Sequence, residues 1–354
     1  MRFAWFGSSL VSSYWNGAAT YYRGLVRALH ERGHEVAFFE PDAYDRQKHR
    51  DISDPPWAEV VVYEPERWKE ALALARHADI VVKASGVGVC DRELEAGILE
   101  LSAGATVFWD VDAPATLARL DADESDPFHR LVPQYDLVLT YGGGDPVVDR
   151  YLEIGARDCV PIYNALDPET HEPAEPAERF RGDLGFLGNR LPDREARVEE
   201  FFLRAAELTP ERSFLLGGAG WHDKPLPLNV RSLGHVPTAD HNAFNCTPLA
   251  VLNVTRQDMA DNGWSPPTRV FEAAGAGACL ITDSWRGLDE FLEPGTEVLV
   301  AEDGEQVAWL LAALTEARAS SIGRSARERV LRDHTYTQRA EQVEQVLEGA
   351  CAVH

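Results

Sequence analysis

Short, continuous apolar runs alternate with amphipathic segments along most of the chain. In the first half the apolar runs predict strands at Arg2–Gly7, Glu35–Glu40, Val60–Tyr63, Ile80–Ser85, Thr106–Asp110, Leu137–Tyr141 and Val160–Tyr163. The amphipathic segments between them predict helices at Thr20–Arg32, Arg67–His77, Arg92–Ser102 and Pro146–Ile154. Strands that are apolar at every position are typical of a parallel sheet with helices on both faces.

The alternation stops at the acidic segment Asp167–Glu178 and then starts again. Three prolines in this segment exclude a helix or an inner strand, so it is the best candidate for a linker. After it, strands are predicted at Leu184–Leu187, Phe214–Gly217, Val230–Leu233, Leu249–Val254, Ala278–Thr282 and Val298–Ala301. Helices are predicted at Arg194–Leu208, Ala239–Cys246, Thr268–Ala276, Gly304–Ala317, Ser321–Asp333 and Thr337–Gly349. The chain is therefore expected to be an α/β protein with two Rossmann-like domains.

Composition narrows the classes of partner. The 354 residues suffice for about two domains, and 58 acidic against 34 basic residues give a formal charge of −24. Such a charge repels nucleic acid and anionic lipid. No apolar run has the roughly 20 residues of a membrane span, and the first residues lack the pattern of a signal peptide.

The five cysteines are scattered and form no CxxC pair. Their odd number and spacing favour reduced thiols over disulfides or a zinc site. We therefore expect a cytoplasmic protein.

The segment 266–283 carries the most informative chemistry. Pro266 and Pro267 suit the start of a helix, because a proline loses no hydrogen bond at the first helical position. The N–H groups of the first turn, with Thr268 and Arg269, would then face an anion. Glu272 follows one turn later and is placed to accept hydrogen bonds from a sugar diol. An ordinary helix with a surface glutamate is the alternative.

This segment, with Gly287–Leu292 and Pro294–Glu297 after it, resembles the C-terminal half of GT-B glycosyltransferases. It is most similar to the CgeB-like (spore-maturation-protein-like) glycosyltransferases, whose pattern is Arg-x-Phe-Glu, small residues, a strand ending in Thr-Asp, and a Pro-Gly-x-Glu turn. The resemblance is specific over about residues 183–300. In the first half it is weaker and rests on Gly24–Val36.

The resemblance implies the GT-B fold, in which two Rossmann-like domains face each other across a cleft. Residues 1–168 would bind the acceptor and residues 179–334 the nucleotide-sugar donor. The helix in 335–354 would cross back to the first domain, although an ordinary terminal helix fits the pattern nearly as well. The family uses a nucleotide-diphosphate sugar as co-substrate, with no cofactor and no metal. Many retaining members of the wider fold carry a second glutamate eight residues before the ribose-binding one; this chain has Trp264 there, so the stereochemistry cannot be inferred from that signature.

The donor side is expected at the carboxyl ends of the second set of strands, because ligands bind there in open parallel sheets. Gly188, Asn189 and Arg194 follow the first of these strands, where glycine permits close backbone approach and arginine matches a diphosphate. His235 and Val236 follow the third strand. There the resemblance implies that the nucleotide base is held mainly by backbone groups. His235 is equally consistent with a structural histidine. The donor residues predicted in this half are Gly188, Asn189, Arg194, His235, Val236, Pro267, Thr268, Arg269 and Glu272.

In the first half, the loop Gly7–Ala19 resembles the loop that approaches the donor phosphate, which makes Ser8, Ser9 and Asn16 candidates. A polar loop with a helix cap would read similarly. Asp110 and Asp112 form an Asp-x-Asp motif, which in the GT-A fold binds a metal. Because the chain has two alternating halves, we interpret them instead as metal-free residues, one of them a candidate general base. Asp112 is as readily the N-cap of a helix at Ala113–Leu120.

The sequence therefore predicts a metal-independent glycosyltransferase that moves a sugar from a nucleotide-diphosphate donor to an acceptor hydroxyl or other nucleophile, on a small molecule or a polymer. Two alternatives share the donor site: a nucleotide-sugar 2-epimerase, and a non-catalytic nucleotide-sugar-binding protein of a surface assembly. Neither the donor base, the sugar, the acceptor nor the stereochemistry follows from the residues, because fold alone does not determine function. The oligomeric state is not predicted.

Overall fold

The computed structural model describes residues 1–14, 16–101, 104–192 and 194–351 of the chain. Trp15, Ser102 and Asp193, which fall within predicted segments, lie outside the described residues. The chain divides into two compact units. The first comprises Met1–Asn164 and Tyr336–His354, and the second comprises Ala165–Thr335.

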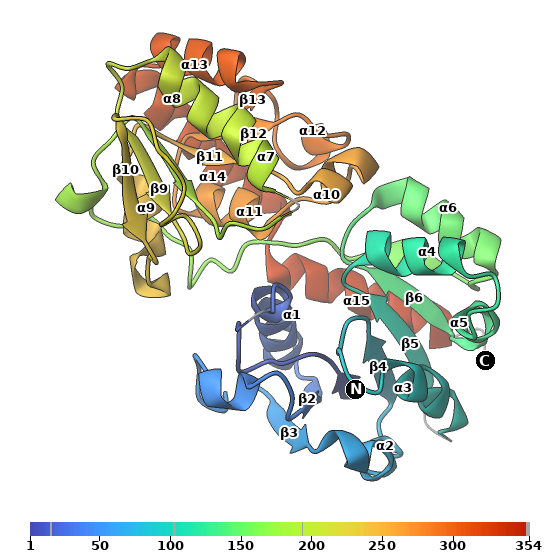
Figure 1. Cartoon of the computed structure of the whole chain (residues 1–354). Helices are drawn as coiled ribbons and strands as arrows, with labels where there is room; N and C mark the ends of the chain where they lie inside the picture. Colours follow the sequence, from blue (N-terminus) through green and yellow to red (C-terminus); the bar gives the residue numbers. More distant parts are fainter. Residues whose placement is uncertain (15, 102–103, 193, 352–354) are drawn as a thin grey trace. The chain divides into compact units, whose positions relative to one another are not determined.

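The first unit is built on a seven-stranded parallel sheet in the order β3-β2-β1-β4-β5-β6-β7 (Figure 1). Its strands are β1 (Arg2–Phe6), β2 (Glu35–Pro41), β3 (Glu59–Tyr63), β4 (Ile80–Ala84), β5 (Ala105–Asp110), β6 (Leu137–Thr140) and β7 (Cys159–Pro161). Aromatic and branched side chains of the central strands are buried, Trp5 and Trp109 completely. Burial of these apolar runs accounts for the continuous hydrophobic pattern in the sequence.

The helices of the first unit follow the strands in alternation. They are α1 (Ala19–Glu31), α2 (Trp68–Ala75), α3 (Asp91–Gly97), α4 (Ala113–Ala122), α5 (Phe128–Leu131), α6 (Gly144–Ile154) and α15 (Tyr336–Cys351).

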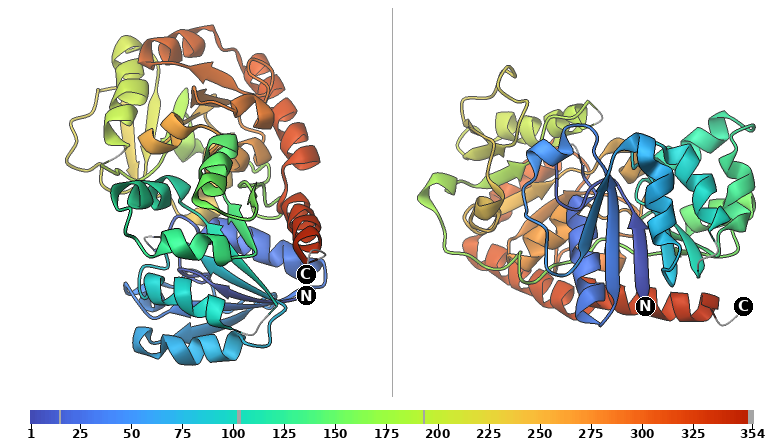
Figure 2. Two further views of the ribbon diagram at one scale, coloured as in Figure 1. Left: turned by 90° about the vertical axis from the view of Figure 1, so that its right-hand side faces the viewer. Right: turned by 90° about the horizontal axis from the view of Figure 1, so that it is seen from below.

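Helix α15 packs against α1 although more than 300 residues separate them in sequence (Figures 1 and 2). Arg32 pairs with Glu341 at 2.9 Å and with Glu344 at 2.6 Å, and the rings of Tyr21 and Tyr336 meet at 6.2 Å. The terminal helix is therefore part of the first unit.

The second unit contains a six-stranded parallel sheet in the order β10-β9-β8-β11-β12-β13. Its strands are β8 (Leu184–Leu187), β9 (Phe214–Gly217), β10 (Val230–Gly234), β11 (Ala250–Asn253), β12 (Leu280–Asp283) and β13 (Leu299–Ala301). Its helices are α7 (Glu195–Val198), α8 (Arg204–Leu208), α9 (His241–Cys246), α10 (Gln257–Asn262), α11 (Thr268–Gly275), α12 (Leu288–Phe291), α13 (Gly304–Ala313) and α14 (Glu316–Asp333). A π-helical turn, Glu199–Leu203, joins α7 to α8. Within the described ranges, no helix combines the length and apolarity that a membrane span requires.

In both sheets the strand order reverses next to the first strand of the unit. This happens between β1 and β4 in the first sheet and between β8 and β11 in the second. In a doubly wound fold the loops at the carboxyl ends of such strands diverge and leave room for a ligand. These two places are where ligand-binding residues are expected.

The proposed linker is fixed to the second unit rather than free. The N–H groups of Ala174 and Ala177 donate to Cys246 Sγ and Thr247 Oγ1, and Leu166 pairs with the backbone of the residues that follow α14. It contains no strand and only a short 3₁₀ turn at Glu178–Phe180, as its prolines require.

The helices at the end of the second unit differ from the predicted ones. The predicted helix Gly304–Ala317 ends at Ala313, and α14 begins at Glu316 rather than Ser321. The Thr315 hydroxyl accepts a hydrogen bond from the N–H of Arg318 and so caps the new helix.

Candidate functional site

Helix α11 begins directly after two prolines, and no side chain caps its N-terminus. Pro267 occupies the N-cap with ψ of 151°. The N–H of Val270 returns to the carbonyl of Pro267, whereas the first-turn N–H groups of Thr268 and Arg269 have no partner within the helix. The first turn therefore presents donors and the positive end of the helix dipole.

Arg269 lies in this first turn and is half-buried. Within the described residues its side chain makes no ion pair and no hydrogen bond. Burial lowers the pKa of the Arg269 guanidinium, and the negative charge of Glu272 acts in the opposite direction. Because a desolvated cation without hydrogen-bond partners is unfavourable, this position gains most from an added anion.

Glu272 faces two histidines from other segments. Its Oε1 lies 3.9 Å from Nε2 of His171, and the two side chains are 17% and 11% exposed. His171 belongs to the segment that was predicted as linker. His241, at the start of α9, donates from Nε2 to the carbonyl oxygen of Val236 at 3.2 Å. Arg269, Glu272, His171 and His241 thus form one cluster, here called the α11 cluster.

Electrostatic effects link the members of the α11 cluster. Burial lowers the pKa of His241 below its ordinary value of 6.5. The carboxylate of Glu272 opposes this shift, whereas Arg269 and His171 reinforce it. One carboxylate therefore lies among one permanent cation and two imidazole rings.

The loops after β8 and β9 are joined backbone to backbone. The N–H of Gly188 donates to the carbonyl of Gly217, and a Cβ on Gly218 would lie 2.1 Å from the carbonyl oxygen of Gly188. Asn189 Oδ1 accepts from the N–H of Ala219 at 3.0 Å, so its side chain holds this pair of loops together. Arg194 is half-buried and lies against Gly188.

His235 and Val236 differ in what they offer. His235 is exposed in the loop after β10, whereas Val236 is buried and contributes its carbonyl to His241. Trp264, at the place of the second family glutamate, has a φ of 44° and donates from Nε1 to Glu290 at 2.5 Å. It anchors the loop before α11.

In the first unit, the predicted donor residues Ser8, Ser9 and Asn16 form hydrogen bonds within their own loop and to Glu40. Ser8 donates to Asn16 Oδ1, and the Asn16 amide donates to the carbonyls of Ser9 and Ser12. Ser9 donates to Glu40, which also accepts from the N–H of Leu10 at 2.6 Å. These side chains are at most 9% exposed. Their small polar groups satisfy the backbone of the loop, which is what buried loops require.

Asp110 is wholly buried and its carboxylate is already used. Oδ1 accepts from Ser85 Oγ at 2.7 Å, from Thr116 Oγ1 at 3.0 Å and from the N–H of Asp112 at 3.0 Å. Oδ2 accepts from the hydroxyl of Tyr151 at 2.5 Å. A general base must reach the proton that it removes. In this position Asp110 holds the loops after β4 and β5 together.

Asp112 is exposed and occupies the N-cap position of α4. Its side chain makes no capping hydrogen bond, whereas its carbonyl accepts from the N–H of Thr116 at 3.1 Å. Of the two aspartates, this is the one whose carboxylate is accessible.

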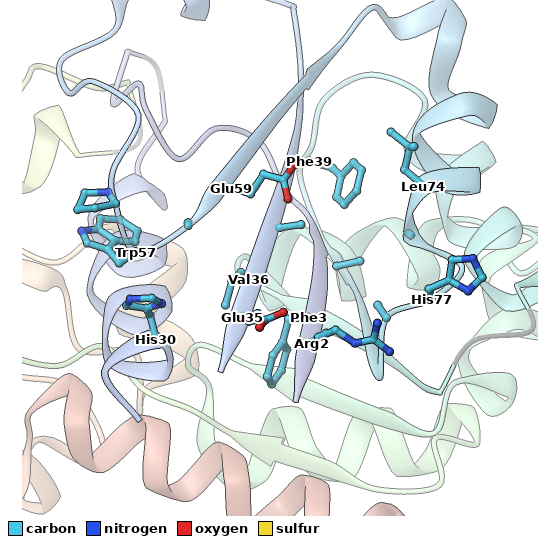
Figure 3. A pocket seen from close by; sticks show the side chains of 16 residues that line it. Arg2, Phe3, His30, Glu35, Val36, Phe39, Trp57, Glu59, Leu74 and His77 are labelled. Carbon is cyan, nitrogen blue, oxygen red and sulfur yellow. The ribbon is translucent and has the colours of Figure 1, made fainter. Parts of the chain in front are cut away.

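A cavity of about 410 Å³ lies at the other end of the first sheet (Figure 3). Its lining comes from the first residues of β1, β2 and β3 and from the end of α2, including Arg2, Glu35, Trp57 and His77. Ligands of open parallel sheets bind at the carboxyl ends, so this cavity is not the nucleotide site.

Sequence reasoning missed both histidines of the α11 cluster. His171 lies in the segment that was interpreted as a linker because of its prolines. His241 lies in a predicted helix, and no motif surrounds it. The one available signal was that His241 comes a few residues after a strand of the second sheet. Their approach to Glu272 depends on tertiary structure.

Comparison with known proteins bears on the second unit most directly. A family described as glycosyl transferase-like matches residues 194–345. Compared by sequence with curated proteins, the chain has no match.

Solved structures match nearly the whole chain. A sucrose-phosphate synthase (tll1590) from Thermosynechococcus elongatus has a TM-score of 0.69 and 14% identity, covering 100% of both chains. Anabaena Alr3699/HepE in complex with UDP and glucose has a TM-score of 0.67 and 14% identity, covering 99% of this chain and 100% of the other. An alpha-glucosyltransferase (AGT) in complex with UDP has a TM-score of 0.69 and 11% identity, covering 98% and 100%. At these identities the similarity establishes the fold. The chain is thus an α/β protein with two parallel Rossmann-like sheets, the fold of solved GT-B glycosyltransferase structures, and residues 194–345 are similar to the glycosyl transferase-like family.

Proposed function

We propose that this protein is a metal-independent glycosyltransferase that uses a nucleotide-diphosphate sugar. The second unit binds the donor and the first unit binds the acceptor. In the reaction the bond between the anomeric carbon and the diphosphate oxygen breaks, and the acceptor nucleophile forms the new bond to that carbon. The acceptor proton passes to a base, and the nucleoside diphosphate leaves.

The observation that carries this proposal is the unpaired, half-buried guanidinium of Arg269 at the start of α11. A diphosphate provides what this position lacks: several anionic oxygens in reach of a planar donor and of free N–H groups. Pro267 fixes the entry of the chain, and Thr268 adds a hydroxyl and an N–H. Arg194, which lies against Gly188, is the second proposed phosphate ligand.

Glu272 is proposed to accept hydrogen bonds from the two ribose hydroxyls. It lies one helical turn beyond Arg269, so a ribose attached to the diphosphate comes within its reach. Its Oε1 lies 3.9 Å from Nε2 of His171, which is too long for a hydrogen bond. The carboxylate is therefore held near a partner but keeps acceptor capacity for a diol. The exposed loop at His235 is proposed to lie next to the nucleobase of the donor.

Departure of the nucleoside diphosphate concentrates negative charge on its leaving oxygen. Arg269, Arg194 and the N–H groups of the first turn of α11 would stabilise that charge without a metal ion. On the acceptor side, Asp112 is the proposed base because its carboxylate is exposed. Asp110 acts as a positioning residue, since it binds the N–H of Asp112.

A thermal-shift screen with UDP-, GDP-, dTDP- and CMP-linked sugars, with and without EDTA, tests the proposal. A ligand that binds only the folded state raises Tm. At a ligand concentration of one hundred times its Kd, it adds about 2.7 kcal/mol to the free energy of unfolding. We expect one nucleoside class to raise Tm equally in both conditions, and to yield nucleoside diphosphate with a glycosylated product. No shift with any donor, or a shift that EDTA removes, would contradict the proposal. Release of an epimerised sugar would identify the protein as a 2-epimerase.

A further inference from the structure

Three loops at the carboxyl ends of the first sheet are tied together by one buried arginine. Arg46 follows β2, is 7% exposed, and its Nη1 donates to the carbonyls of Ser8 at 3.2 Å and Val87 at 3.3 Å. Ser8 follows β1 and Val87 follows β4. These two strands flank the point where the strand order reverses, which is where a doubly wound sheet binds ligands.

Tyr44 lies beside this arginine in a strained conformation. Its φ is 57°, a region that bulky residues avoid, and that of Asp45 is 56°. The ring is nevertheless 54% exposed, so it contributes little to the core. Non-glycine residues in such conformations persist where the surrounding structure holds them, and they concentrate at functional sites.

The surroundings hold the Tyr44 ring in place from two directions. Its hydroxyl donates to the carbonyl of Gly88 at 2.6 Å, and the guanidinium carbon of Arg46 lies 5.0 Å from the ring centroid. Gly88 is itself fixed, because its N–H donates to Asp91 at 2.8 Å and Asp91 pairs with the fully buried Lys83 at 2.7 Å. An exposed aromatic ring is thus kept rigid by buried charges.

Polar and charged residues flank Tyr44 in the sequence. The exposed residues around it in sequence are Asp42, Asp45, Lys48 and His49, and Lys48 pairs with Asp45 at 2.7 Å. A second exposed aromatic residue, Tyr14 in the loop after β1, stacks on His49 with centroids 4.0 Å apart. The loops after β1 and β2 therefore expose two aromatic rings, and exposed polar residues flank Tyr44 in the sequence.

We propose that Tyr44 is the stacking platform for a sugar ring of the acceptor. This inference rests on the proposed function and names the acceptor class, a glycoside or oligosaccharide. A sugar ring has a face of C–H groups that packs on an aromatic ring and an edge of hydroxyls that needs polar partners; the exposed Tyr44 ring and its polar border provide both. A flat apolar aglycone would leave that border without partners.

Saturation-transfer NMR on the full-length protein tests this inference. The probes are methyl glucoside, methyl galactoside, maltose and cellobiose, with phenol and naphthol as apolar aromatic probes. In the Tyr44→Asn variant the ring is removed and replaced by a residue that tolerates a positive φ, so the loop keeps its conformation. The Tyr44→Trp variant keeps an aromatic face. Trp309→Ser is the matched control, because Trp309 is 69% exposed on α13 of the other unit.

We expect a glycoside signal confined to protons of one ring face. It should weaken about tenfold in Tyr44→Asn and persist in Tyr44→Trp and Trp309→Ser. A glycoside signal that survives Tyr44→Asn would overturn the inference, as would phenol or naphthol binding without glycoside binding. Absence of any glycoside signal would also overturn it. Binding of the nucleotide sugar, measured in the same samples, separates the outcomes: it stays unchanged in every variant if only this inference fails, and is absent from the wild type if the proposed function fails.

Discussion

The start of α11 and the loops at the carboxyl ends of the first sheet differ in how their polar groups are hydrogen-bonded. Both are polar segments beside a parallel sheet. In the first unit, Glu40, Asp110 and Asn16 find their partners within the protein. At the start of α11, Arg269 finds none within the described residues, and the first N–H groups remain unused.

This difference indicates what each place can bind. A closed polar network adds rigidity and leaves little charge for a ligand, so recognition there depends on shape and on exposed rings such as Tyr44. A cation whose partners are missing is a strong recognition element for an anion. Donor binding is therefore expected to depend on charge in the second unit, and acceptor binding on surface contacts in the first.

The largest effect is expected from removing the unpaired charge. Arg269→Ala should weaken binding of the best nucleotide sugar by about 10–150-fold, because a charge-assisted hydrogen bond contributes roughly 1.5–3 kcal/mol. Glu272→Gln should reduce affinity through the ribose by a smaller factor. Isothermal titration calorimetry measures both.

Arg204→Ala provides the matched control. Arg204 lies on α8, is 44% exposed and already pairs with Glu207, and its loss changes the net charge by the same amount. If Arg204→Ala weakened binding as much as Arg269→Ala, the effect would be one of overall charge, and the role of Arg269 would be rejected.

An intermediate effect is expected from the closed network. Asp110→Asn should lower stability by about 1–3 kcal/mol, because an amide cannot accept all the hydrogen bonds that Ser85, Thr116, Tyr151 and the backbone donate. Asp112→Asn, at an exposed position, should change stability by less than about 0.5 kcal/mol but reduce the rate of transfer. Urea unfolding and initial rates measure the two properties. Unchanged transfer in Asp112→Asn would remove it as the base.

The smallest effect is expected from pH. Because burial lowers the pKa of His241, the unfolded chain binds a proton more readily than the folded protein. Stability from this group is fully present above pH 6.5, its unfolded value, and is lost as pH falls through the lower folded pKa. His241→Asn should flatten the pH dependence of Tm below 6.5, and His235→Asn, at an exposed position, should not. Identical profiles in both variants would contradict the assignment.

The sheets were predictable from the sequence because their strands are unbroken apolar runs. β8 and β9 have the predicted bounds, and β1 and β5 differ by one residue. Helix ends were less predictable, since the break before α14 depends on the hydroxyl of Thr315 and not on a glycine or proline. Short helices such as α10 and α12 have too few residues to show a period.

The candidate site was predictable only in part. Arg269 and Glu272 share one helix, so their spacing in sequence implies their proximity. His171 and His241 come from distant segments, and only the fold brings them to Glu272. Asp110 and Ser9 are both buried. Neither the Asp-x-Asp motif nor the composition of the loop Gly7–Ala19 reveals that burial. The positive φ of Tyr44 has no signature in the sequence, because glycine is the residue that normally marks it.

The central claim is that the α11 cluster binds the diphosphate and ribose of a nucleotide sugar. A crystal structure of the protein with the best ligand from the donor screen tests it most directly. We expect diphosphate oxygens within about 3 Å of the Arg269 guanidinium and the first N–H groups of α11, with the ribose hydroxyls on Glu272. A nucleotide bound elsewhere, with Arg269 still lacking an anionic partner, would contradict the account.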